Sequence, residues 1–289
     1  MKIRAAVLHE IGASAPFAQS QPLKIEELDL DPPGPGEVLV KIRAAGLCHS
    51  DLSVINGVRP RPVPMALGHE AAGEVVQLGE GVTDLKPGDQ VVLVFVPSCG
   101  HCMPCAEGRP ALCEPGAEAN AKGTLLSGAR RIHQHAHDVN HHVGVSAFAD
   151  HAVVSRHSCV KVDADLDPAE AALFGCAVLT GVGAVINTAR VQAGTTVAVL
   201  GLGGVGLCAM LGAIAAGARH VIAIDLHDSK LEVARSLGAT ATVNARDPDA
   251  GDKVKALTGG GVDYAFEMAG SVQAMEAAYR MTRRGGMTV

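Results

Sequence analysis

The segment Val197–Asp225 constrains the fold of this chain more than any other, because it combines a strand, a glycine-rich turn, a helix and a second strand. The apolar and partly β-branched run Val197–Leu200 is typical of a strand buried on both faces of a parallel sheet. Gly201, Gly203 and Gly206 then form a G-x-G-x-x-G pattern, which permits a tight turn, a close approach to a pyrophosphate and close packing of helix on strand. The following helix offers its N-terminal amides to phosphate groups. The segment therefore predicts a dinucleotide-binding unit.

The residue that closes the second strand indicates which dinucleotide this unit binds. Asp225 follows Val221–Ile224, about 20 residues past the turn, where a carboxylate can accept hydrogen bonds from the adenosine ribose hydroxyls. A 2′-phosphate would be repelled there, so the sequence favours NAD over NADP. The uncharged run 195–218 also has the length of a membrane helix with a Gly-x-x-x-Gly face. Four glycines in its first half disfavour that helix and fit a buried strand, turn and helix instead.

Length and charge narrow the class of protein. A chain of 289 residues is long for one hydrophobic core and predicts two domains. A net charge of −6 without a basic cluster argues against nucleic-acid binding. No basic segment followed by an apolar run marks a signal peptide, so we expect a cytoplasmic protein that does not bind membranes. The eight cysteines are then expected to be metal ligands or buried apolar residues rather than disulfides.

Short strands joined by turns are predicted for the first 95 residues. Val38, Val40 and Ile42 alternate after a proline- and glycine-rich turn, and Val91–Val96 follows a second turn. This spacing predicts a compact, barrel-like β domain.

The most specific spacing in the chain is that of four cysteines, Cys99, Cys102, Cys105 and Cys113. Thiolates this close together, on a loop rich in glycine and proline, suit a closed tetrahedral zinc site. An iron–sulfur cluster is the alternative, but its usual fourth cysteine follows after three residues and precedes a proline, whereas seven residues intervene here. Structural zinc is therefore the favoured interpretation.

Histidines are concentrated between residues 133 and 142. His133, His135 and His137 would share one face of a strand and could bind a metal together with His141 and His142. No thiolate or carboxylate cluster completes such a site, so a solvated loop is the favoured interpretation.

The second half of the chain has the pattern of an α/β unit. Residues 171–183 lead helically toward the first nucleotide strand, which puts the domain boundary near Val178. The later segments predict a helix at Ser229–Leu237, followed by a short strand that begins with Gly238–Ala241. They also predict a fourth strand at Val262–Phe266, a helix at Gln273–Arg283 and a fifth strand that contains Gly285–Val289. Two βαβαβ halves need six strands, so the sequence looks truncated.

These motifs together resemble one family, the zinc-dependent medium-chain alcohol dehydrogenases, over essentially the whole chain. The box Gly68-His69-Glu70-x-x-Gly73, the four-cysteine lobe, Gly175-Cys176 and the glycine turn stand in the order and at the spacings of that family. The resemblance implies an α/β protein with an N-terminal GroES-like barrel as catalytic domain, 1–177, whose structural zinc lobe spans about 97–115. It also implies a C-terminal Rossmann domain, 178–289, with a doubly wound parallel sheet.

The resemblance further implies that Cys48, His69 and Cys176 bind a catalytic zinc. Two thiolates and one imidazole leave a fourth position open for substrate, which is the ligand set of an alcohol dehydrogenase. Asp51 would orient His69, and Glu70 would lie near the metal. Contacts to the cofactor are implied for Thr180, Lys230 and the turn residues Gly201, Leu202, Gly203, Gly204, Val205 and Gly206.

Two departures from the family pattern concern proton transfer and cofactor binding. Ser50 matches the hydroxyl that takes the alcohol proton, but Ser53 replaces the histidine that many members carry at the far end of the relay. His49 stands where some members have an arginine that touches the pyrophosphate.

The sequence thus predicts an alcohol dehydrogenase that uses NAD and two zinc ions per chain on an alcohol or aldehyde. The resemblance implies a homo-oligomer, a dimer or a tetramer. Alternatives within the family are a glutathione-dependent formaldehyde dehydrogenase and a polyol or amino-acid-alcohol dehydrogenase. A non-catalytic protein that binds NAD and zinc is the alternative from another class.

Overall fold

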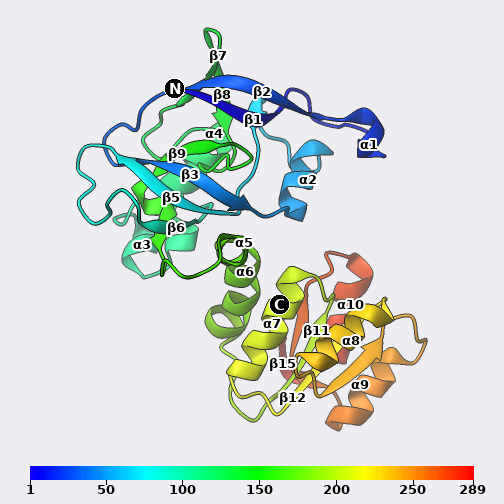
Figure 1. Ribbon diagram of the computed structural model, residues 1–289. Helices are drawn as coiled ribbons and strands as arrows, with labels where there is room; N and C mark the ends of the chain where they lie inside the picture. Colours follow the sequence, from blue (N-terminus) through cyan, green and yellow to red (C-terminus); the bar gives the residue numbers. More distant parts are fainter. The chain divides into compact units, whose positions relative to one another are not determined.

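Two groups of strands form the framework of the first of two units, Met1–Cys176 and Ala177–Val289 (Figure 1). The computed structural model describes residues 1–289. One group of strands closes into a barrel in the order β1 (Lys2–Leu8), β2 (Leu23–Leu30), β7 (Ile132–Gln134), β8 (His137–His141) and β4 (Met65–Ala66). The other group is a five-stranded sheet in the order β10 (Cys159–Lys161), β6 (Gln90–Leu93), β5 (Ala71–Leu78), β3 (Glu37–Ala45) and β9 (His151–Ser155).

The alternating apolar residues predicted to form a strand lie on β3. Val38 and Val40 point into one apolar cluster, while Leu39 belongs to a second cluster with residues of the barrel strands. The strand is therefore buried on both faces at its start and becomes half-exposed only after Val40. The predicted barrel-like domain is confirmed.

The helices of the first unit are short and lie in its connections. They are α1 (Phe17–Ser20), α2 (His49–Ile55), α3 (Met103–Ala106), η1 (Pro110–Leu112), α4 (Glu114–Lys122), η2 (Arg156–Ser158), α5 (Pro168–Ala172) and η3 (Leu173–Gly175).

The second unit is a parallel sheet with helices around it. Its strands follow the order β13 (Ala241–Asn244), β12 (His220–Asp225), β11 (Thr196–Leu200), β14 (Val262–Glu267) and β15 (Thr282–Thr288), and every neighbouring pair is parallel. The helices are α6 (Ala177–Gly183), η4 (Ala184–Ala189), α7 (Gly204–Ala215), α8 (Asp228–Ser236), α9 (Ala250–Thr258) and α10 (Val272–Met281). The Rossmann prediction is confirmed, with the glycine turn joining β11 to α7.

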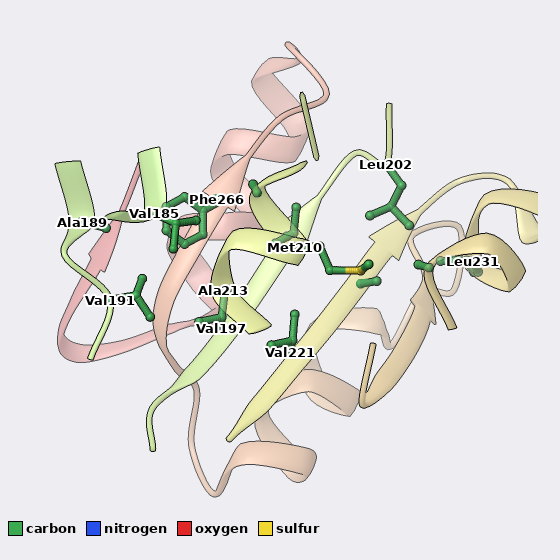
Figure 2. Packing of buried hydrophobic residues seen from close by; sticks show 14 residues of the cluster. Val185, Ala189, Val191, Val197, Leu202, Met210, Ala213, Val221, Leu231 and Phe266 are labelled. Atoms are coloured by element: carbon green, nitrogen blue, oxygen red, sulfur yellow. The ribbon is translucent and has the colours of Figure 1, made fainter. Parts of the chain in front are cut away.

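The core of this unit is built from small aliphatic residues. Figure 2 shows Val197 and Val221 of adjacent strands beneath Met210 and Ala213 of α7, with Phe266 of β14 in the same cluster. Because both faces of β11 are covered, all five of its residues are buried. The continuous apolar run that predicted a two-sided strand is thus explained by the packing.

The segment 171–183 differs from the prediction of a continuous helical run. Cys176, with φ −143° and ψ −70°, separates the turn Leu173–Gly175 from α6. A Cβ on Gly175 would collide with the carbonyl oxygen of Leu93. The chain therefore approaches β6 too closely for a regular helix to pass, and the break turns the Cys176 thiol toward other residues of the first unit. The strand predicted at Val91–Val96 likewise ends early, at Leu93.

The run 195–218 forms β11, the turn and α7 rather than one membrane-length helix. No single helix of the chain is both long enough and apolar enough to cross a membrane. One pair of helices, 168–175 and 177–189, reaches that length and apolar composition together, but it is bent between them.

Two glycines of the turn make a matched pair for a stability test. A Cβ on Gly206 would collide with the carbonyl oxygen of Gly201, whereas a Cβ on Gly203 would meet no atom within 4 Å. Gly206→Ala should therefore lower the free energy of unfolding by about 1–3 kcal/mol. Gly203→Ala should lower it by less than about 1 kcal/mol. Urea unfolding of the two variants in the absence of nucleotide checks this, and equal midpoints would contradict it.

Candidate functional site

The site begins at the N-terminus of α2. Cys48 is the residue that caps this helix, and its amide donates to Oδ2 of Asp51 at 3.3 Å. An acidic residue in the first turn is favoured because it faces unpaired amides and the positive end of the helix dipole. The hydrogen bond at the start of the helix thus holds Cys48 next to the buried carboxylate of Asp51.

The other side of that carboxylate holds His69. Its Nδ1 lies 3.0 Å from Oδ1 of Asp51, and the two side chains are 3% and 5% exposed. A hydrogen bond to a carboxylate places the proton on Nδ1 and leaves Nε2 to bind other groups. Gly68 precedes it with φ +95°, and a Cβ there would collide with the amide of Phe148. Only glycine fits this close approach.

Four side chains converge next to His69. Ligand atoms of Cys48, His69, Glu70 and Cys176 all lie within 4.8 Å of one another. The sulfurs of Cys48 and Cys176 are 3.8 Å apart. Two sulfurs bound at about 2.3 Å to one tetrahedral zinc would also be separated by about 3.8 Å. The donor set and its spacing therefore fit a zinc ion without rearrangement of the two thiols.

The electrostatics of this cluster favour a cation. Hydrogen bonds with Cys176 and His69 lower the pKa of Cys48 to about 3 against the effect of burial. The same contact with Cys48, together with burial, raises the pKa of Cys176. Burial opposes the charge on His69, but hydrogen bonds to Asp51 and Cys48 raise its pKa to about 9. The thiolate of Cys48 is thus paired with a cation, which is the protonated His69 as long as no metal is bound.

A second group of thiols lies in the lobe formed by α3, η1 and the start of α4. The sulfurs of Cys99, Cys102, Cys105 and Cys113 lie within 4.8 Å of one another. Amides of Cys99 and Gly116 point at the sulfur of Cys113, at 3.2 and 3.4 Å. Amide donors to sulfur stabilise thiolates, and the four residues offer a closed set of donors with no open position.

The nucleotide turn shows a role for Asp225 that the sequence did not indicate. Its Oδ2 accepts from the amide of Leu202 at 2.8 Å, and its Oδ1 accepts from the amide of His227 at 3.0 Å. Burial disfavours its charge, but these amides and Lys230, 3.6 Å away, hold its pKa below the ordinary value. The carboxylate therefore orders the glycine turn itself. Gly201 needs its φ of +90° in this turn. Of the other residues predicted to contact the cofactor, Thr180 lies within α6 and Val205 lies in the first turn of α7.

The residues predicted for proton transfer lie on α2. Ser50 is half-buried in its first turn. The hydroxyl of Ser53 donates to the carbonyl oxygen of His49 at 3.0 Å. The hydroxyl of Ser53 is thus hydrogen-bonded within its own helix, and His49 is exposed.

The histidine tract is not the solvated loop that the sequence favoured. It forms the hairpin of β7 and β8, in which His133 pairs with Asp31 and Asp138 at 2.9 and 3.1 Å. His141 and His142 are 0% and 3% exposed. His141 ends β8 and His142 begins the turn after it, and both side chains are buried, which the polar sequence did not reveal. His142 lies against Asp51 and His69, a contact that sequence spacing could not indicate.

Comparisons with known proteins show which family the chain belongs to. Residues 34–164 match the alcohol dehydrogenase GroES-like domain, and residues 204–289 match the zinc-binding dehydrogenase family. The chain is 41% identical over 288 residues to an S-(hydroxymethyl)glutathione dehydrogenase of Synechocystis, covering 99% of this chain and 76% of the relative. Benzyl alcohol dehydrogenase from Acinetobacter calcoaceticus superimposes with a TM-score of 0.90 at 35% identity, covering 100% of this chain and 76% of that one. A zinc-binding dehydrogenase from Sinorhizobium meliloti 1021 bound to NADP superimposes with a TM-score of 0.76 at 30% identity, covering 100% of this chain and 76% of that one.

The buried His141 predicts a measurable pH dependence of stability. Burial lowers its pKa from 6.5 to about 3, and its Nε2 accepts from the amide of Arg131 at 3.0 Å. The folded protein therefore keeps this imidazole neutral while the unfolded chain protonates it, so the free energy of unfolding falls as the pH drops below about 6.5.

His141→Gln retains an acceptor for that amide but has no such titration. Between pH 6.5 and 5, where carboxylates stay ionised, the variant should lose about 1–2 kcal/mol less than the parent. Urea unfolding at several pH values measures this difference. Parallel pH curves for the two proteins would contradict the prediction.

Proposed function

The chain belongs to the zinc-dependent medium-chain alcohol dehydrogenase family, and from this premise we propose that Cys48, His69 and Cys176 are its catalytic zinc ligands. The observation that carries the proposal is the 3.8 Å between the two sulfurs, beside an imidazole whose second nitrogen is held by Asp51. Glu70 lies within reach of the same position and would be a further ligand there. Zinc bound here supplies a Lewis acid that lowers the pKa of an alcohol hydroxyl or polarises a carbonyl.

The residues of the chain itself then position the reactants and the proton. Asp51 keeps the proton of His69 on Nδ1, so that Nε2 always faces the metal position. Ser50, in the same helix turn, is proposed to take the alcohol proton. Because Ser53 donates to a helix carbonyl and has no basic nitrogen, the relay is proposed to end in water rather than in a side-chain base.

NAD is the proposed hydride acceptor, bound by the second unit. The glycine turn 201–206 would face the pyrophosphate, Asp225 and Lys230 the adenosine ribose, and Thr180 and Val205 the nicotinamide. We retain 1–177 and 178–289 as the catalytic and nucleotide domains. The four cysteines of the lobe are proposed to hold a second, structural zinc. The cytoplasm remains the proposed compartment, since all eight cysteines are free thiols.

A primary alcohol is the proposed substrate class. The named relatives act on S-(hydroxymethyl)glutathione and benzyl alcohol, which share a terminal CH₂–OH group. The test is NAD reduction with a panel containing benzyl alcohol, formaldehyde plus glutathione, a secondary alcohol and a polyol. We expect the primary alcohols to give the highest kcat/KM.

The metal-ligand assignment has a matched cysteine control. Cys176→Ser should lower kcat/KM by at least about 100-fold, because it removes a ligand. Cys159→Ala should stay within about 3-fold of the parent, because that buried thiol lies in neither cluster and its pKa is raised to about 12. Equal losses in both variants, or a parent that turns over no alcohol, would contradict the proposed function.

Two zinc ions of unequal lability are expected per chain. The site of Cys48, His69 and Cys176 is open, whereas the four-cysteine site is closed, so a chelator should abolish activity before it unfolds the lobe. Metal analysis should give one zinc fewer in Cys176→Ser and, separately, in Cys102→Ser. One zinc in the parent, or iron with sulfide, would refute this.

Asp225 should set the cofactor preference. The parent should show a higher kcat/KM with NAD than with NADP, and Asp225→Asn should narrow the ratio by about 10-fold because it removes the charge but keeps one acceptor for the turn. Asp225→Gly should in addition weaken the binding of both cofactors, since the amide of Leu202 loses its partner. Equal kcat/KM values in the parent would overturn the assignment.

A further inference from the structure

His142 is the one buried histidine next to the proposed metal position to which no role has been given. It is 3% exposed, and its Nδ1 has no well-aligned hydrogen-bond partner. The acceptor that it faces is Oδ1 of Asp51, 3.3 Å away. That same oxygen receives Nδ1 of His69 at 3.0 Å. A buried ring nitrogen left without a partner destabilises the folded protein, so its orientation toward the carboxylate needs a reason.

We propose that His142 is a positioning residue for the catalytic zinc site, which donates from Nδ1 to Asp51 and thereby fixes the carboxylate that orients His69. This inference rests on the proposed function of Cys48, His69 and Cys176. Asp51 then has three donors: the amide of Cys48 on Oδ2, and two imidazoles on Oδ1. One carboxylate links the backbone of one proposed ligand to the side chain of another.

The rings of the two histidines pack edge to face. Their centroids are 5.5 Å apart with an interplanar angle of 88°, and Phe95 makes a similar contact with His69 at 5.7 Å and 88°. The imidazole of His69 is therefore restrained by two rings as well as by its hydrogen bond. Loss of His142 would remove one donor to Asp51 and one of these rings.

The backbone that carries His142 is unusually constrained. The turn after it contains Val143 at φ +44° and Ser146 at φ +52°, both in the left-handed region that a β-branched residue in particular avoids. The amide of His142 donates to the hydroxyl of Ser146 at 2.9 Å, and the amide of Val145 donates to the carbonyl of His142 at 3.0 Å. Strain of this kind persists where the surrounding structure fixes the conformation.

The same turn is attached to the segment that carries His69. The amide of Ala147 donates to the carbonyl of Gly68 at 3.0 Å, and that of Phe148 donates to the carbonyl of Leu67 at 3.0 Å. The two histidines therefore sit on backbones that are hydrogen-bonded to each other a few residues away. This is a rigid frame for one oriented metal ligand, rather than an accidental contact.

The experiment compares His142→Asn, His142→Leu and a control, His133→Asn, in the zinc-loaded full chain. Asparagine places an amide nitrogen where Nδ1 stood, whereas leucine offers no donor. His133 lies on β7 of the hairpin that leads to His142, but its partners are Asp31 and Asp138. The readouts are the rate of zinc transfer to a chromophoric chelator and the visible absorption of the cobalt-substituted protein.

His142→Leu should release the zinc of the open site about 10- to 100-fold faster and shift the cobalt bands. His142→Asn should stay within about 3-fold of the parent, and His133→Asn should match it. Retention of the four-cysteine metal in each variant shows that the unit has folded. Adding His142→Leu to Asp51→Asn should give little further increase, since His142 acts through the carboxylate that Asp51→Asn has already removed.

Parent-like release and spectra in His142→Leu would overturn the inference, and so would a defect in His142→Asn as large as that in His142→Leu. A parent whose zinc content is unchanged by Cys176→Ser would instead overturn the proposed function.

Discussion

The carboxylate of Asp51 is the group on which the organisation of the proposed zinc site depends. It is buried, and it is ionised because burial is outweighed by hydrogen bonds with His142 and His69, which lower its pKa. Through it, the N-terminus of α2, the segment before β5 and the turn after β8 meet at one point. A carboxylate buried without such partners would be protonated, since an unpaired charge in the protein interior is costly. The site is therefore cooperative: its acid is charged because its histidines are present, and its histidines are oriented because the acid is charged.

The parts of this structure that sequence could predict are those in which one local rule suffices. Alternation of Val38 and Val40 gives a strand, the apolar run Val197–Leu200 gives a buried strand, and the glycine turn gives the join to α7. The four-cysteine spacing also works locally, because the residues lie within fifteen positions of one another. In each case the residues that make the structure are neighbours in the chain.

What the sequence could not give are contacts between distant segments. The meeting of His142 with Asp51 joins positions 91 residues apart, and polar residues around it suggested solvent. The break at Cys176 arises because Gly175 packs on Leu93, far away in the chain. The resemblance to a known family supplied Cys176 as a ligand, but composition and periodicity predicted a continuous helical run through it. Tertiary packing overrides local propensity at these points.

Asp225 illustrates how a binding residue and a structural residue can be the same. Its two oxygens already accept amides of Leu202 and His227, so the lone pairs left for a ribose are those of a fixed carboxylate. A fixed acceptor loses little entropy when a ligand binds, which is the physical meaning of preorganisation. The same bonds hold the backbone that must face the pyrophosphate. Changing this residue to accommodate a 2′-phosphate would therefore also loosen the phosphate-binding turn. A shift of specificity toward NADP through a residue that has no acceptor, such as glycine, is therefore expected to need a second change that restores an acceptor for Leu202, because charge and loop order here depend on one side chain.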